Sequence, residues 1–217
     1  MSKTRIRQHV NPLSDKFKEE ITLPEWNQIY TNLDLPLHFD IGCAKGKFLL
    51  EMAQLHSEMN FLGIEIRNSL VIDANKEKDK LGLTNLHYLF GSINYSASKI
   101  LSSLPPNIIQ YITVQFPDPW FKRKHNKRRV IQPELVNILV DYLAVDGKIF
   151  LQSDIKEVAI EMSDRFADNS LLTRQHSETW LAENPLSVAT ERELYVLQDN
   201  LPVYRTLFKK VSNSGTN

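Results

Sequence analysis

The chain has 217 residues, enough to bury a sizeable core, and is expected to form one domain over residues 1–217. Its 26 Lys and Arg balance its 26 Asp and Glu, so net charge does not predict a polyanionic partner, and such a partner would need a local basic patch. A single cysteine, Cys43, excludes an internal disulfide framework, and no apolar run suits a secretory signal or a membrane span.

We therefore expect a cytoplasmic protein without membrane contact, with mobile ends over residues 1–12 and 212–217. The six histidines are scattered and lack cysteine partners at zinc-like spacing, so no metal is expected.

Short apolar runs alternate with amphipathic segments through the first two thirds of the chain. The apolar runs predict strands over residues 37–42, 61–66, 86–91, 111–116 and 148–154. Helical patterns predict helices over residues 47–56, 69–80 and 97–104, and from Pro133 onward. Strands and helices that alternate in this way predict an α/β, Rossmann-like fold with a mostly parallel central sheet and helices on both faces.

The last third of the chain has a different pattern. Residues 170–177 and 203–210 look like strands, with the loop LAENPLSVATERE between them. These two segments predict a C-terminal antiparallel hairpin that closes the sheet.

The stretch DIGCAKGKF forms the first turn between a strand and a helix. Such a glycine-rich turn lets the backbone approach a ligand closely. A dinucleotide fingerprint would need glycines where Ala44 and Lys47 stand, which disfavours a nicotinamide oxidoreductase. The stretch is instead similar to the first motif of the S-adenosylmethionine-dependent methyltransferases. That similarity implies that Asp40, Gly42 and Gly46 contact the methionine part of the donor, and a tight turn without a ligand is the alternative.

Polar residues also follow the second and third predicted strands. Glu65, in GIEIR, can accept hydrogen bonds from both hydroxyls of a ribose, and the alternative is a strand-end carboxylate paired with Arg67. In GSIN, Ser92 and Asn94 stand where methyltransferases of this superfamily commonly place a polar residue against adenine. Ser92 is the better candidate by position.

The stretch QFPDPWFKRKHNKRR places one acid, Asp118, just beyond the fourth predicted strand. Because ligands of open parallel sheets bind beyond the carboxyl ends of the strands, Asp118 should lie beside the donor site. Pro117 and Pro119 fix φ and remove backbone donors, which predicts a stiff loop. Trp120 and Phe121 offer flat surfaces for a base, and the cations behind them can neutralise phosphates. A solvated basic face is the alternative, but the acid and the aromatic pair favour nucleic acid.

Together with DIGCAKGKF upstream and TERE downstream, this stretch closely resembles the bacterial tRNA (guanine-N7)-methyltransferases. The similarity runs from RQHVNPL to PVYRTLF, nearly the whole chain. It implies a class I methyltransferase fold and transfer of the methyl group of S-adenosylmethionine to N7 of guanine 46, in the variable loop of tRNA, leaving S-adenosylhomocysteine.

The resemblance also implies roles for individual residues, carried over by position. Its donor contacts are Asp40, Glu65, Ser92 and Asp118. Its substrate contacts are Lys122, Asp154, Thr190, Glu191, Arg192 and Glu193. Its RNA contacts are Lys124, His125, Asn126, Lys127, Arg128 and Arg129.

Guanine N7 carries an in-plane lone pair, so no proton must leave before it attacks the sulfonium methyl group. We therefore expect the catalytic residue, Asp118, to orient the base and stabilise the developing positive charge, without being an obligate general base. Two alternatives remain: a methyltransferase that acts on an exocyclic base amine, and a non-catalytic RNA-binding module. The protein is expected to act as a monomer or a homodimer.

Overall fold

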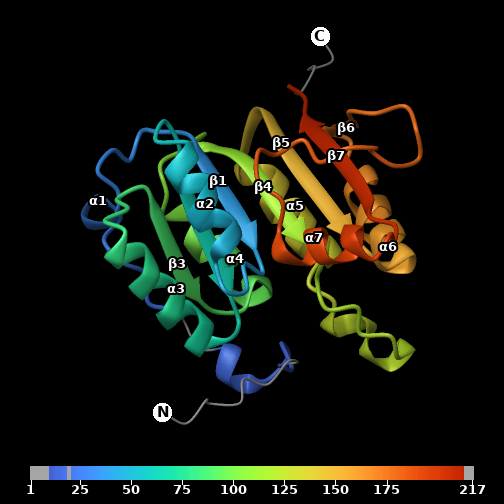
Figure 1. The fold of residues 1–217 in the computed structure, drawn as a ribbon, viewed down its shortest axis with the longest axis horizontal. Coiled ribbons are helices and arrows are strands. Elements are labelled where there is room, and N and C mark those ends of the chain that lie inside the picture. Colours follow the sequence, from blue (N-terminus) through green and yellow to red (C-terminus); the bar gives the residue numbers. More distant parts are fainter. Residues whose placement is uncertain (1–9, 19–20, 213–217) are drawn as a thin grey trace.

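The computed structural model describes residues 10–18 and 21–212, in which a seven-stranded sheet lies between two layers of helices (Figure 1). The strands are β1 (Leu37–Ile41), β2 (Asn60–Glu65), β3 (Leu86–Phe90), β4 (Ile109–Gln115), β5 (Leu143–Ser153), β6 (Leu172–Arg174) and β7 (Tyr204–Lys210). The helices are α1 (Trp26–Ile29), α2 (Lys47–Leu55), α3 (Asn68–Lys80), α4 (Ile93–Ser102), α5 (Pro133–Tyr142), α6 (Lys156–Ala167) and α7 (Glu191–Gln198), with 3-10 turns η1 (Asp15–Phe17) and η2 (Arg123–Arg128). The predicted mobility of residues 1–12 and 212–217 falls largely outside the described residues.

The strand order β3-β2-β1-β4-β5-β7-β6 confirms the predicted fold class. Strands β1 to β5 are parallel, and β7 is antiparallel to both β5 and β6. The sheet grows from β1 toward β3 on one side and from β4 onward on the other, which creates a switch point between β1 and β4. The carboxyl ends of the parallel strands share one edge, the lower edge in Figure 1, and the segment with η2 projects from it.

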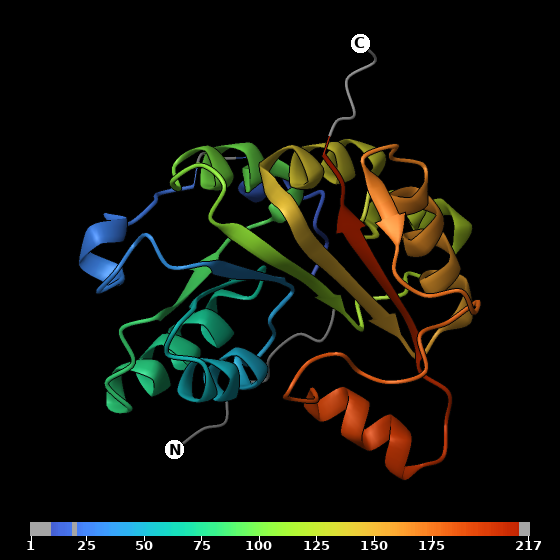
Figure 2. The same cartoon turned by 90° about the horizontal axis from the view of Figure 1, so that it is seen from above.

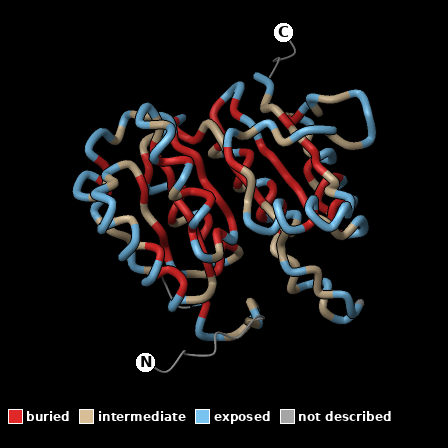
Figure 3. Tube along the Cα trace, viewed as in Figure 1, coloured by how far each residue is buried: buried red, intermediate tan, exposed pale blue. Residues whose placement is uncertain are grey.

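Side chains of β1 alternate between the two faces of the sheet, as those of any strand do. Leu37, Phe39 and Ile41 join the apolar cluster that also contains the buried residues of α4 and α5. His38 lies on the opposite face, where its ring contacts Phe48 of α2. Figure 2 shows α2, α3 and α7 on one face of the sheet and α4 and α5 on the other. In Figure 3 the buried segments follow the strands, and exposed segments cover the outside.

Three elements differ from the sequence prediction. No helix is predicted over residues 156–167, where α6 forms, and α7 begins inside the predicted loop LAENPLSVATERE and continues to Gln198. Strand β5 begins at Leu143, before the predicted start at residue 148, and its pairing with β4 is irregular near Asp146, which has a left-handed conformation (φ 66°). The antiparallel pair β6–β7 is present as predicted, although β6 has only three residues.

Candidate active site

A cleft of about 940 Å³ opens at the carboxyl ends of β1, β2 and β4. Val10 and Pro12 from the N-terminal segment also line it. Most of the predicted site residues line it, namely Asp40, Gly42, Glu65, Ser92, Asn94, Asp118, Arg128, Asp154, Thr190, Glu191 and Arg192. Gly46, Lys122 and Glu193 are not among the residues that line the cleft.

The two glycines of the first turn have different functions. Gly42 has φ 82°, and a Cβ atom there would meet nothing within 4 Å, so the backbone is open to a ligand. Gly46 also has a positive φ, but a Cβ atom there would lie 2.6 Å from Cζ of Tyr88, whose hydroxyl donates to the carbonyl oxygen of Gly46. Gly46 therefore makes room for a buried ring, and its predicted contact with the donor stays a prediction. Between them, Ala44 has φ 50°, a conformation that favours glycine.

Asp40 is buried at the end of β1, on the wall of the cleft. Its Oδ1 accepts hydrogen bonds from the hydroxyl of Thr113 (2.5 Å) and from the amide of Gln115 (3.5 Å). Burial raises the pKa of Asp40 to about 6, against these two hydrogen bonds, and the nearby charge of Glu65 adds to the rise. A buried carboxylate that is costly to ionise suits a site that receives a cationic group.

Glu65 lies buried at the end of β2 and is held by its neighbours. Its Oε1 accepts from the backbone N–H and the Nε–H of Arg67, at 3.0 and 2.8 Å. Its Oε2 accepts from the backbone N–H of Ala44, at 3.0 Å. Glu65 thus forms the ion pair with Arg67 that was the alternative to a ribose contact. Its carboxylate nevertheless lines the cleft. A ribose would share Glu65 with Arg67.

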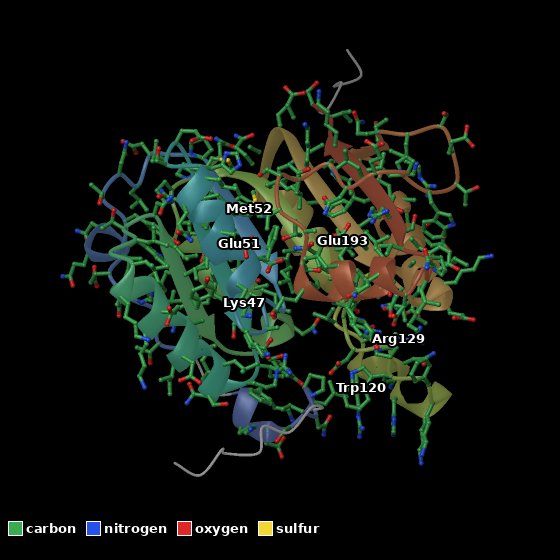
Figure 4. The ribbon with its side chains drawn as sticks, viewed as in Figure 1. Lys47, Glu51, Met52, Trp120, Arg129 and Glu193 are labelled. Atoms are coloured by element: carbon green, nitrogen blue, oxygen red, sulfur yellow. The ribbon has the colours of Figure 1, made fainter. Side chains whose placement is uncertain are left out.

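The Pro117-Asp118-Pro119 loop is held at both ends. Phe116 and Trp120 flank it in left-handed conformations, with φ 49° and 44°. Arg129 donates from Nε to the carbonyl oxygen of Pro119 at 2.8 Å and forms an ion pair with Glu161 of α6. Arg129 therefore anchors the loop internally, and its predicted contact with RNA stays a prediction. Figure 4 shows Trp120 and Arg129 at the root of the projecting segment.

The projecting segment presents three lysines to solvent. Its exposed polar residues are Lys122, Lys124, Asn126 and Lys127. The guanidinium of Arg128 lies 5.0 Å from the ring of Trp120, and the His125 ring meets the same indole edge-on at 5.7 Å. Phe121, by contrast, is 73% exposed and also lines the cleft. Of the two aromatics predicted to stack on a base, Phe121 offers the open face.

The TERE motif opens α7 and forms the wall opposite Asp40. The hydroxyl of Thr190 caps the helix by accepting from the N–H of Glu193 at 3.1 Å. Two ion pairs fix this end of α7: Lys47 of α2 with Glu191, at 2.6 Å, and Arg192 with Asp154 after β5. These contacts place the first turn of α7 against both the start of α2 and the end of β5.

Glu193 is not among the residues that line the cleft, and its predicted contact with the substrate stays a prediction. It is 1% exposed, and its carboxylate accepts hydrogen bonds from Arg205, Gln152 and Asn184 at 2.7, 3.0 and 2.8 Å. Together with Thr113 and Gln115, these partners form a polar network that no local sequence pattern indicates, because its members lie far apart in the chain.

Two further searches cover residues 10–18 and 21–212. No helix in that part of the chain is long and apolar enough to cross a membrane. No group of three or more His, Cys, Asp or Glu side chains there could hold a metal ion.

Solved structures share the fold at low sequence identity. The 16S rRNA methyltransferase KamB superposes with a TM-score of 0.59 at 17% identity, covering 89% of this chain and 96% of that chain. A cleft at the switch point, with a buried acid at the end of β1 and open backbone beside it, fits the donor of such enzymes. The fold is that of the class I methyltransferases, with an open cleft at the switch point of the sheet.

Sequence comparison specifies the family. A methyltransferase family model, Methyltransf_4, matches residues 34–206. The tRNA (guanine-N(7)-)-methyltransferase of Microcystis aeruginosa is 53% identical over 209 residues, covering 96% of this chain and 99% of the relative. The enzyme of the same name from Nostoc sp. is 55% identical over 208 residues, covering 96% and 95%. The chain belongs to the tRNA (guanine-N(7)-)-methyltransferase family.

Proposed function

We propose that this protein transfers the methyl group of S-adenosylmethionine to N7 of guanine 46 in the variable loop of tRNA. The observation that carries the proposal is the position of Asp118. It lies in the same cleft as Asp40 and Glu65 and at the root of the exposed basic segment, so one carboxylate adjoins both the donor site and the RNA-facing surface. The cytoplasmic location and the monomeric or homodimeric state stay predictions.

The residues present fit the donor. Asp40, beside the open backbone at Gly42, would hold the ammonium of its methionine part, Glu65 would hold its ribose, and Ser92 and Asn94 would contact its adenine. When bound, the donor supplies an electrophilic methyl group on a positively charged sulfur.

The chain itself aligns the target base. Asp118 accepts hydrogen bonds from N1–H and the exocyclic amine of guanine and stabilises the positive charge that develops on the purine. No proton is removed from N7. Asp154 and the first turn of α7 complete the pocket from the opposite wall.

Methyl transfer to bulk unmodified tRNA, followed by chain cleavage specific for N7-methylguanine, tests this function. We expect cleavage at a single position in the variable loop. Methylated tRNA that resists the cleavage would indicate an exocyclic amine as the acceptor instead. A protein that binds tRNA but gives no heat with S-adenosylmethionine in calorimetry would be a non-catalytic RNA-binding module.

Donor affinity should fall at low pH because Asp40 becomes neutral. Its folded-state pKa is about 6, so the carboxylate carries its negative charge at pH 7.5. It becomes protonated and loses that charge as the pH falls below 6. We expect the Kd for S-adenosylhomocysteine to rise by up to about tenfold per pH unit below that point, as measured by calorimetry. Asp40→Asn should bind weakly at every pH, with a flat profile. A wild-type affinity that is constant from pH 7.5 to 5 would contradict this role.

Phe121 should contribute to tRNA binding through stacking. Stacking on an aromatic ring is worth about 1–3 kcal/mol per base, so we expect Phe121→Ala to raise the KM for tRNA roughly 5- to 100-fold. Phe121→Trp should keep most of the affinity, because it keeps a flat ring. As a matched control, Lys124→Ala should lower the salt dependence of binding, whereas Phe121→Ala should leave the salt slope unchanged. An unchanged KM in Phe121→Ala would exclude the stacking role.

A further inference from the structure

A row of polar side chains crosses the face of the sheet that carries α2 and α7. It spans four neighbouring strands, with Asp40 on β1, Thr113 and Gln115 on β4, Gln152 on β5 and Arg205 on β7. Asp40 pairs in register with Thr113, Gln115 with Gln152, and Gln152 with Arg205. Because register partners present their side chains on the same face, these groups meet beneath the helices.

The amide of Gln152 has one orientation that satisfies its neighbours. Gln152 is fully buried, and its nitrogen donates to Oε1 of Gln115 at 2.8 Å and to Oε2 of Glu193 at 3.0 Å. Its oxygen accepts from Nε of Arg205 at 3.3 Å. A reversed amide would set an oxygen against the Glu193 carboxylate and leave a nitrogen against a guanidinium. The position of Glu193 therefore determines the orientation of Gln152.

Gln115 transmits this orientation to Asp40. Its oxygen accepts from Gln152, which leaves its nitrogen as the donor to Asp40, at 3.5 Å. That hydrogen bond lowers the pKa of Asp40, against the larger effect of burial. The titratable groups around Asp40 include Glu65 on β2, Cys43 in the first turn, Tyr88 on β3 and His38, which is linked to it through Thr113.

The row joins two walls of one cleft. Asp40 lies on the donor wall, and Glu193 follows directly on Thr190, Glu191 and Arg192, which line the opposite wall. Since an unpaired buried polar group is costly, α7 cannot shift without breaking the bonds of Glu193 and Gln152 together. A shift of α7 at one wall of the cleft therefore changes the hydrogen bonds that reach Asp40 at the other wall.

We propose that Gln152 and Gln115 are positioning residues that couple the donor end of the cleft to its base-binding end, so that donor and tRNA each strengthen the binding of the other. The inference rests on the proposed function and adds coupling between its two ligands. Neither glutamine is expected to take part in the chemical step.

The test compares tRNA affinity with and without saturating S-adenosylhomocysteine. In the wild-type protein we expect S-adenosylhomocysteine to lower the Kd for tRNA about 5-fold or more. In Gln152→Met, which keeps the length of the side chain but removes the amide, this factor should fall toward 1. Donor binding should also lose affinity at a higher pH than in the wild type, because Gln115 is no longer oriented toward Asp40. Gln175→Met, an exposed glutamine in the segment after β6, is the matched control and should keep the wild-type factor.

A folded Gln152→Met protein with the wild-type coupling factor would overturn the inference, as would a wild-type protein whose tRNA affinity ignores S-adenosylhomocysteine. If Gln152→Met does not fold, the same measurement is made with Gln115→Met, because Gln115 is only half-buried and its replacement should disturb the core less. Failure of the proposed function looks different, since the wild-type protein would then not methylate tRNA at N7. Failure of the coupling alone leaves that methylation intact.

Discussion

Asp118→Asn should lower kcat by about 10²–10³-fold and leave the Kd for tRNA nearly unchanged. The substitution keeps the size of the side chain and removes its charge, which we expect to act mainly when positive charge develops on the guanine. Loss of one preorganised group of this kind costs about 2.7–4 kcal/mol of transition-state stabilisation. Single-turnover methyl transfer with saturating tRNA and donor measures the effect on chemistry directly.

The phosphate contacts of the basic segment do not depend on Asp118, so filter binding should show tRNA affinity within about threefold of the wild type. Asp146→Asn is the matched control, because Asp146 is an exposed acid after α5 that pairs with Lys209, outside the cleft. It should leave kcat unaltered. Near-normal turnover by Asp118→Asn would remove Asp118 from the catalytic role.

The parallel half of the fold follows from local sequence patterns. Strands β1 to β4 begin within two residues of their predicted starts, because each is a short apolar run bounded by turn residues. Once these strands are parallel, the residues after them must meet at one edge of the sheet. That is why Asp40, Glu65, Ser92 and Asp118 could be placed in one site from the sequence, and the structure brings them to one cleft.

The parts that escaped prediction depend on contacts distant in sequence. Helix α7 has a weak apolar pattern, because its buried residues are Val196 and a charged residue, Glu193, while Leu194 and Tyr195 are exposed. The burial of Glu193 is stabilised by Arg205, which no spacing rule connects to it. Arg129 is likewise part of a basic run in the sequence, yet its partner Glu161 lies on a helix that was not predicted.

Backbone strain marks the same cleft independently of the motifs. Among the described residues, six other than glycine have a positive φ: Ala44, Asn107, Phe116, Trp120, Asp146 and Asn200. Asn and Asp tolerate this conformation, which explains half of them. Ala, Phe and Trp do not, and all three of these residues line the cleft. Strained residues of this kind often cluster at functional sites, which agrees with the proposed placement of the donor and of Asp118 in this cleft.

Removal of the ion pair between Glu193 and Arg205 should have the second large effect, which is on the free energy of unfolding rather than on methyl transfer. Both side chains are almost fully buried and form an ion pair at 2.7 Å. Removing one partner of a buried pair leaves an uncompensated charge and costs about 3–5 kcal/mol. We therefore expect Arg205→Met to lower the free energy of unfolding by that amount in urea denaturation, and to lower Tm by roughly 6–20 °C.

A double variant separates the anchoring role of Glu193 from a role in substrate binding. Glu193→Gln alone should destabilise the protein about as much as Arg205→Met, whereas Glu193→Gln combined with Arg205→Met should recover most of the loss, because no unpaired charge remains buried. If Glu193 contacted tRNA directly, Glu193→Gln would instead raise the KM for tRNA at unchanged Tm, and the double variant would keep that defect. The buried carboxylate predicts the first pattern: Glu193 holds the first turn of α7 in place, and the residues before it line the cleft.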